Sequence, residues 1–194
     1  VYKRQVLGHH GVAVLDGGIG AWTAAGLPLT RDVPAFPATD LRLAGTWAHT
    51  IERDALRSRL GSLALLDARA GPRYRGEIEP IDAVPGHIPT AVSAPTDGNL
   101  APDGRFLAPT DLAARYRDLG AAEPDREVVI SCGSGVSACH HALAMRAAGL
   151  PDPLLYPGSY SDWTQQGYPV ATGPAPGDLG DPGDSGDPGD PPAR

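Results

Sequence analysis

The 194-residue chain has two cysteines, one lysine and no long apolar run. Two cysteines supply neither a disulfide framework nor the clustered ligands of a metal site. A membrane-spanning helix needs about 20 mostly apolar residues, and the sequence offers no segment of that kind. These scarcities favour a protein of the reducing cytoplasm that contacts no membrane.

Positive charge comes almost entirely from arginine, because Lys3 is the one lysine among 16 basic residues. Any anion site must therefore consist of guanidinium groups and backbone amides. The formal net charge is −7, which lends no support to nucleic-acid binding.

Part of the negative charge belongs to the end of the chain. Residues 174–194 repeat Gly, Pro and Asp in a three-residue rhythm, and from Gly177 onward they hold five Asp and one Arg. The segment is too short for a collagen helix and has nothing to bury. We expect a disordered acidic tail, with a docking role as the alternative.

An internal repeat organises the rest. Val14–Leu29 (VLDGGIGAWTAAGLPL) aligns without gaps on Leu155–Val170 (LYPGSYSDWTQQGYPV) at an offset of 141 residues. Both segments predict a strand end, a glycine turn, a short helix with a Trp and a Gly-Pro stop. The identical pairs are Gly17 and Gly158, Trp22 and Trp163, Thr23 and Thr164, Gly26 and Gly167, and Pro28 and Pro169.

The repeat predicts the domain organisation. The second copy closes a complete domain at 46–173, so the first copy should close another domain, of which 1–30 is the C-terminal remnant. Pro34 and Pro37 indicate an inter-domain linker at 31–45. We expect the chain to be the C-terminal part of a tandem protein whose partner is its own N-terminal domain.

Between the repeats, apolar runs alternate with amphipathic helices. This order is typical of an α/β fold with a mostly parallel sheet and helices on both faces. Thr110 is expected to cap the second helix. The predicted strands are 64–67, 91–93 and 127–131, and the predicted helices are 50–60, 110–119 and 136–148.

Cys132 follows the last of these strands, and ligands of parallel sheets bind at the carboxyl ends of the strands. Two glycines in the next three residues let backbone amides turn toward the sulfur, and the following helix presents its positive end. Such surroundings stabilise a thiolate. The alternative is a buried structural cysteine. The residues expected to stabilise negative sulfur are Gly133, Ser134, Gly135, Val136, Ser137 and Ala138.

Three arginines in DARAGPRYRG follow the strand that ends at Asp67, at the same edge of the sheet. Arginine stays protonated and offers paired donors to a sulfonate or carboxylate. The competing interpretation of Arg69, Arg73 and Arg75 is a salt bridge with Asp67 or Glu77. Asp67 is expected to orient its neighbours rather than act as an acid.

The loop CGSGVSA resembles the active-site loop of the rhodanese-type sulfurtransferases. The resemblance continues through LLDARAGPRYRGEIEPID, GHIPTAVSAP and LYPGSYSDW, and covers residues 62–173. It implies a rhodanese-like domain, an inactive first rhodanese domain upstream, and Arg73 and then Arg69 as anion-binding residues. The departures from the usual residues are Ser137 for Thr, Thr90 for Gly, Ser93 for Asn and Tyr160 for Trp.

The resemblance also implies the chemistry. The Cys132 thiolate takes the outer sulfur of a small anionic donor, becomes a persulfide, and passes the sulfur to cyanide or a thiol; no metal or organic cofactor is needed. The CGSG loop is similar to that of mercaptopyruvate-type enzymes, whereas RYRGEIEPID and PTDGNLAPDGRF are similar to bacterial enzymes assigned to thiosulfate. We favour thiosulfate and keep 3-mercaptopyruvate as the alternative.

Two other function classes fit less well. Related phosphatases need an Arg where this chain has Ala138, and non-catalytic rhodanese-like modules usually lose the cysteine. Cys139 is expected to lie in the core. The histidines carry no predicted chemistry: His87 belongs to a structural turn, and His140 and His141 are packed or solvated.

Overall fold

A computed structural model describes residues 11–38, 40 and 49–178. Within these residues the strands form a four-stranded sheet in the order β2-β1-β3-β4 with every pair parallel. The strands are β1 (Ala64–Asp67), β2 (Val92–Ser93), β3 (Val128–Ser131) and β4 (Leu154–Leu155). The predicted α/β fold is therefore confirmed.

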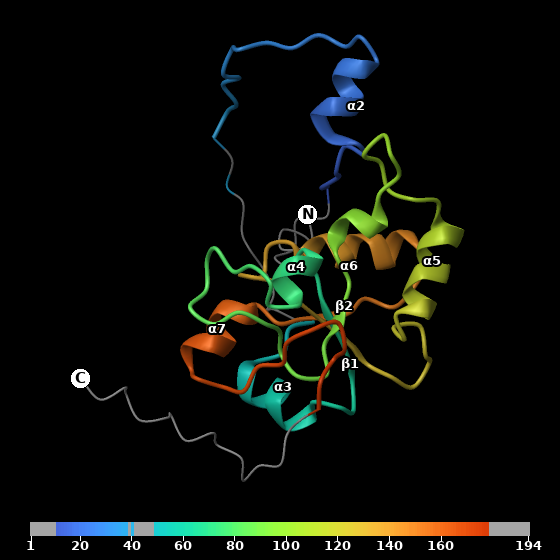
Figure 1. Cartoon of the computed structure of the whole chain (residues 1–194). Helices are drawn as coiled ribbons and strands as arrows, with labels where there is room; N and C mark the ends of the chain where they lie inside the picture. Colours follow the sequence, from blue (N-terminus) through green and yellow to red (C-terminus); the bar gives the residue numbers. More distant parts are fainter. Residues whose placement is uncertain (1–10, 39, 41–48, 179–194) are drawn as a thin grey trace, which may run out of the picture.

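Alternating side chains of the two central strands pack into two separate hydrophobic cores, one on each face of the sheet. Leu66 and Ile130 point to the face covered by α5 (Pro109–Asp118) and α6 (Ala138–Ala147). Leu65 and Val129 point to the other face, where α3 (Arg53–Arg59), α4 (Gly71–Tyr74) and α7 (Ser159–Gln165) lie. Figure 1 shows helices on both sides of the sheet. Both faces are buried, so β1 and β3 carry uninterrupted apolar runs.

Helix starts differ from the sequence prediction. Helix α5 begins at Pro109, with Ala108 at the N-cap position and no side-chain cap. The expected Thr110 cap is therefore wrong, because proline has a preset φ and no N–H and starts the helix one residue earlier. Helix α6 begins at Ala138 rather than at Val136, which leaves Val136 and Ser137 in the cysteine loop.

The two copies of the repeat have the same local structure. In α2 (Gly18–Ala24) the Trp22 Nε1–H donates to the carbonyl of Pro28 over 2.9 Å, and in α7 the Trp163 Nε1–H donates to Pro169 over 2.8 Å. Gly26 and Gly167 end the two helices with φ angles of 70° and 67°. The structure thus confirms the helix and the glycine stop in both copies, whereas the glycine before the helix differs, with a φ of 77° at Gly17 and −64° at Gly158.

The strand end predicted for the first copy is absent, because residues 14–15 are assigned to no strand while Leu155 lies in β4. Within the part of the chain that the structure describes, the first copy has no neighbouring strand to complete a ladder. In Figure 1 α2 stands apart from the sheet on long irregular segments. Residues 31–38 are also irregular and exposed.

Part of the tail prediction lies outside the described residues, namely 179–194. The first residues of the predicted tail pack against the domain, because the carbonyl of Pro176 accepts the Thr90 N–H over 2.7 Å. None of the helices in the described ranges has the length and apolar character that crossing a membrane requires.

Candidate active site

Cys132 lies directly after β3, and its side chain is buried. Its N–H donates to the Ser159 hydroxyl over 3.0 Å, and its carbonyl accepts the Tyr160 N–H over 3.0 Å. The Ser161 N–H donates to Gly133 over 3.1 Å. The start of α7 therefore fixes the backbone of Cys132 through both its N–H and its carbonyl, and fixes the carbonyl of Gly133 as well.

Gly135 shapes the loop. Its φ is +76°, which side chains rarely adopt, and a Cβ there would lie 2.6 Å from the carbonyl oxygen of Pro157. At Gly133 a Cβ would lie 3.6 Å from Arg73 Nη1, an ordinary contact distance, so the arginine lies beside this position without requiring glycine there. The cysteine loop is therefore close to the segment before α7 on one side and to an arginine on the other.

Ser159 is a site residue that sequence reasoning missed. It is fully buried and non-glycine with a φ of +54°, a conformation that costs free energy unless its surroundings hold it. Its hydroxyl lies 2.8 Å from the Tyr156 carbonyl and 3.9 Å from Cys132 Sγ. The only sequence signal was its place in PGSYSDW, after the strand that pairs with β3.

Arg69 is enclosed by carboxylates and carbonyls. Its guanidinium contacts Asp67 at 2.6 Å and Glu79 at 3.3 Å, donates to the Gly86 carbonyl at 2.6 Å, and lies 3.7 Å above the Tyr160 ring. Burial disfavours its charge, but the hydrogen bonds and attraction of Asp67 outweigh burial and raise the pKa of Arg69. The structure places Arg69 and Asp67 in the buried salt bridge that the sequence left as an alternative.

Arg73 is the arginine that reaches the cysteine loop. One edge of its guanidinium is held by Glu79, at 3.2 Å from Nε and 2.6 Å from Nη2, and by Asp82 at 3.1 Å from Nη2. Within the described residues Nη1 makes no hydrogen bond, and it is the nitrogen beside Gly133. Arg75 is instead paired with the exposed Glu77 at 2.6 Å.

Glu79 and Asp82 were not assigned a role from the sequence, although EIEPID is visibly acidic. Burial raises the pKa of Glu79, but hydrogen bonds from Arg73 and from the N–H groups of Asp82 and Ile81 outweigh it and hold that pKa below its usual value. Glu79 is therefore ionised at neutral pH and bridges Arg69 and Arg73.

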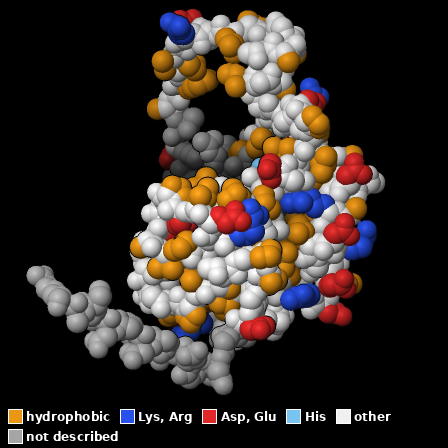
Figure 2. Space-filling model, in the orientation of Figure 1, with side chains coloured by type: hydrophobic (Ala, Val, Ile, Leu, Met, Phe, Trp, Pro, Cys, Tyr) orange, Lys and Arg blue, Asp and Glu red, His pale blue; other side chains and the backbone are white. Residues whose placement is uncertain are grey.

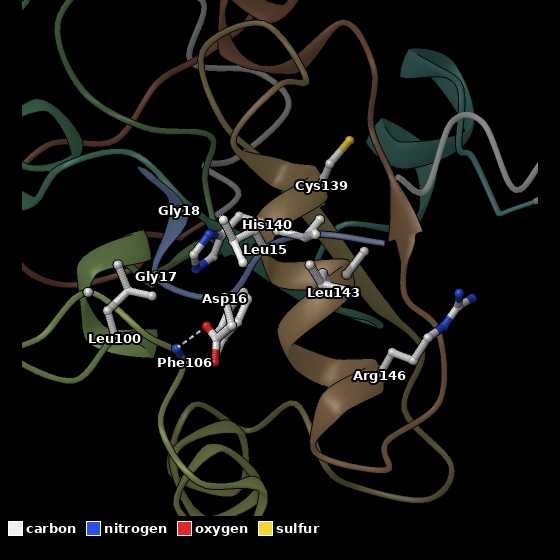
Figure 3. Close-up of a pocket in the computed structure, with 13 residues that line it drawn as sticks. Leu15, Asp16, Gly17, Gly18, Leu100, Phe106, Cys139, His140, Leu143 and Arg146 are labelled. Atoms are coloured by element: carbon white, nitrogen blue, oxygen red, sulfur yellow. Dashed lines mark hydrogen bonds between the residues drawn. The ribbon is translucent and has the colours of Figure 1, made fainter. Parts of the chain in front are cut away.

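Cys139 faces a different part of the molecule. It is half-buried and packs against the core cluster that α5 and α6 cover, and it lines a pocket of about 410 Å³ between α6 and residues 14–18. Figure 3 shows this pocket, with the Phe106 N–H donating to Asp16 over 2.9 Å. Cys132 does not line this pocket, so the two cysteines belong to different surfaces.

The three histidines of the catalytic domain whose contacts are described, His87, His140 and His141, serve packing. His87 is buried and stacks on Tyr74 at 3.8 Å. His141 is buried with its Nδ1 2.9 Å from the Tyr116 hydroxyl, and His140 tilts against Phe106. The described residues contain no group of three or more His, Cys, Asp or Glu placed to hold a metal ion.

A doubly covered parallel sheet with a cysteine loop at its carboxyl edge defines the class of this domain. Residues 52–166 match the Rhodanese-like domain, so the chain belongs to the rhodanese family.

Its relatives are sulfurtransferases by name. The chain is 49% identical over 166 residues to the probable 3-mercaptopyruvate sulfurtransferase of Pseudomonas aeruginosa, covering 84% of this chain and 58% of the relative. It is 37% identical over 174 residues to the thiosulfate sulfurtransferase of Rattus norvegicus, covering 85% and 57%. The chain thus spans little more than half the length of these relatives.

Solved structures agree on the fold. The Tum1 protein of Saccharomyces cerevisiae superposes with a TM-score of 0.76 at 23% identity, over 88% of this chain and 64% of that one. At such identity the likeness speaks for the fold alone.

Proposed function

We propose that this chain is the catalytic part of a sulfurtransferase that carries sulfur as a persulfide on Cys132. The observation that carries the proposal is the pairing of a buried cysteine, held by α7 in a loop that Gly135 shapes, with an arginine whose Nη1 lies beside Gly133 of the same loop. The family and the names of the relatives support general sulfur transfer.

The proposed reaction has two displacement steps. The Cys132 thiolate attacks the outer sulfur of thiosulfate; the S–S bond of the donor breaks, and sulfite leaves with the bonding pair. A nucleophilic acceptor, cyanide or a thiolate, then attacks the outer sulfur of the persulfide and releases the Cys132 thiolate. Both steps balance without a metal or an organic cofactor.

Each site residue has a part in this reaction. The backbone amides of residues 133–138 stabilise the negative persulfide, as in an oxyanion hole. Arg73 Nη1 binds the anionic part of the donor. Arg69 acts through Glu79, which it contacts together with Arg73, and Asp67 orients Arg69.

3-Mercaptopyruvate is the second candidate donor. It is favoured by the Pseudomonas relative, which is 49% identical and named for that substrate. The pairing of all three predicted arginines with carboxylates also weakens the preference for a dianion such as thiosulfate. The ratio of kcat/KM for the two donors with one common acceptor decides between them.

The proposal includes a tandem arrangement. The first repeat copy has the local structure of a domain-closing unit, and the chain spans 58% of the length of its Pseudomonas relative. We infer that the body of an inactive first rhodanese domain lies before residue 1 and that residues 1–30 are its C-terminal remnant. Neither cysteine forms a disulfide within the described residues, and we propose the reducing cytoplasm as the location of the protein.

Mass spectrometry tests the central step. After incubation with thiosulfate or 3-mercaptopyruvate, we expect one added sulfur on the peptide that contains Cys132. Cys132→Ser should abolish the adduct, and the matched control Cys139→Ser should keep it. An adduct that survives in Cys132→Ser contradicts the proposal.

A further inference from the structure

Asp82 connects the donor arginine to the cysteine loop. Its carboxylate lies 3.1 Å from Arg73 Nη2 and accepts the Ser161 hydroxyl over 2.6 Å. The backbone N–H of the same serine donates to Gly133 over 3.1 Å. Asp82 therefore lies one hydrogen-bonded residue away from the loop that holds the reactive sulfur.

The ion-pair cluster around Arg73 carries one surplus negative charge. It contains two guanidinium groups and three carboxylates, so its formal charge is 2 − 3 = −1. Asp67 pairs with Arg69, and Glu79 bridges both arginines. Asp82 forms an ion pair with Arg73 alone. Asp67 and Glu79 already balance the charges of the two arginines, so Asp82 supplies the surplus negative charge.

This surplus charge is poorly screened by solvent. The side chain of Asp82 is 7% exposed and that of Glu79 is 3% exposed. Salt and water screen buried charges much less than exposed ones. An anion that binds Arg73 Nη1 is therefore repelled by the Asp82 carboxylate, which accepts a hydrogen bond from Nη2 of the same guanidinium.

We propose that the Asp82 carboxylate repels the donor anion bound at Arg73, and that its charge sets the preference of the site between singly and doubly charged sulfur donors. The inference rests on the proposed function, because it assumes that the donor binds at Arg73. Coulomb repulsion is proportional to ligand charge. The Asp82 carboxylate therefore penalises binding of a dianion about twice as much, in free energy, as binding of a monoanion.

Asp82→Asn removes this charge. Asparagine has nearly the same shape and keeps an oxygen for the Ser161 hydroxyl, so the contact to the cysteine loop stays; its amide nitrogen replaces the oxygen that faces Arg73 Nη2, so the charge and the hydrogen bond to Arg73 are lost together. Asp103→Asn is the matched control, because Asp103 is an exposed carboxylate that also faces an arginine, Arg105, at 3.7 Å.

The measurement is anion binding in a Cys132→Ser background, which cannot react. Isothermal calorimetry compares thiosulfate, a dianion, with pyruvate, the singly charged product of 3-mercaptopyruvate. We expect Asp82→Asn to lower the dissociation constant of thiosulfate about tenfold and that of pyruvate about threefold, since the factor for a dianion is about the square of that for a monoanion. Asp103→Asn should change neither.

The alternatives give different results. Equal factors for the two anions, or no change in either, overturn the inference. Weaker binding also overturns it, because Asp82 would then serve to position Arg73. If Asp82→Asn does not fold, Asp82→Ser is used for the same comparison. A missing Cys132 persulfide would refute the proposed function, while the two dissociation constants would still report on Asp82.

Discussion

The segments 14–29 and 155–170 share a sequence pattern and internal hydrogen bonds but differ in burial. Tyr160 and Trp163 are almost fully buried in α7, whereas α2 has no buried residue. Ile19, the counterpart of Tyr160, is 69% exposed. Figure 2 shows apolar side chains on the surface of the part that projects from the body of the molecule.

This contrast separates local from tertiary causes. A glycine stop and a Trp-to-carbonyl hydrogen bond form within a few residues and therefore occur in both copies. Burial depends on a sheet and on covering helices, which only the second copy has within the described residues. The exposed apolar face of the first copy fits a proposed domain upstream.

The largest expected difference between the copies is in stability. Trp163→Ala should lower the free energy of unfolding by about 3–5 kcal/mol, because it empties a buried site. Trp22→Ala should cost less than about 1 kcal/mol, since its half-buried ring only bonds to its own segment. Urea unfolding measures both values, and equal losses would show that residues 14–29 belong to the same cooperative core.

Acid should act on the packed domain rather than on the exposed segment. Burial, with the nearby charges of His140 and Arg115, lowers the pKa of His141 from 6.5 to about 3. The unfolded chain therefore binds a proton below pH 6.5 while the folded chain does not, so stability is lost as the pH falls from about 6.5 to about 3, by up to about 1.4 kcal/mol per pH unit.

The variant His141→Gln should flatten this part of the pH profile. Urea unfolding at a series of pH values measures the slope, and His49→Gln is the control, because His49 is exposed. An unchanged slope in His141→Gln would mean that other groups dominate the acid response.

Hydrogen exchange should separate the copies at the backbone. The amides of residues 128–130 lie in a central strand and should exchange only on global unfolding. The amides of residues 12–15 have no strand partner among the described residues and should exchange much faster than those of the central strand. Comparable protection in both places would argue against a remnant; protection that arises only with the N-terminal domain present would support the tandem proposal.

The smallest expected effect is that of Ile19→Ser. Because Ile19 is exposed, the free energy of unfolding of this chain should change by less than about 0.5 kcal/mol. In a two-domain protein the same change should destabilise the interface, whereas Tyr160→Ser should destabilise the chain in either context. Thermal unfolding of the single-domain and two-domain forms measures both.

Much of the site was predictable because its signals are local in sequence. β1 and β3 match the predicted strands within one residue, since buried parallel strands are short, continuous apolar runs. Cys132 was placed correctly after β3 for the same reason. The helix starts were less accurate, because Pro109 and the turn at Gly135 decide them through backbone geometry.

The residues that were missed come from distant positions. Ser159 lies 27 residues after Cys132 and reaches it only because β4 pairs with β3. Asp82 meets Ser161 across 79 residues. No local pattern marks such pairs.

The sequence by itself determined the alternating α/β order, the cysteine after a buried strand, the glycines around it and the repeated closing unit, because each is a pattern within about 20 residues. Only the tertiary structure decided that Arg69 is enclosed by Asp67 and Glu79. It also decided that Arg73 places one guanidinium nitrogen beside Gly133 and that Asp82 binds another nitrogen of the Arg73 guanidinium. An arginine contacts the carboxylates that the fold brings within about 3 Å, and spacing along the chain does not specify which ones these are.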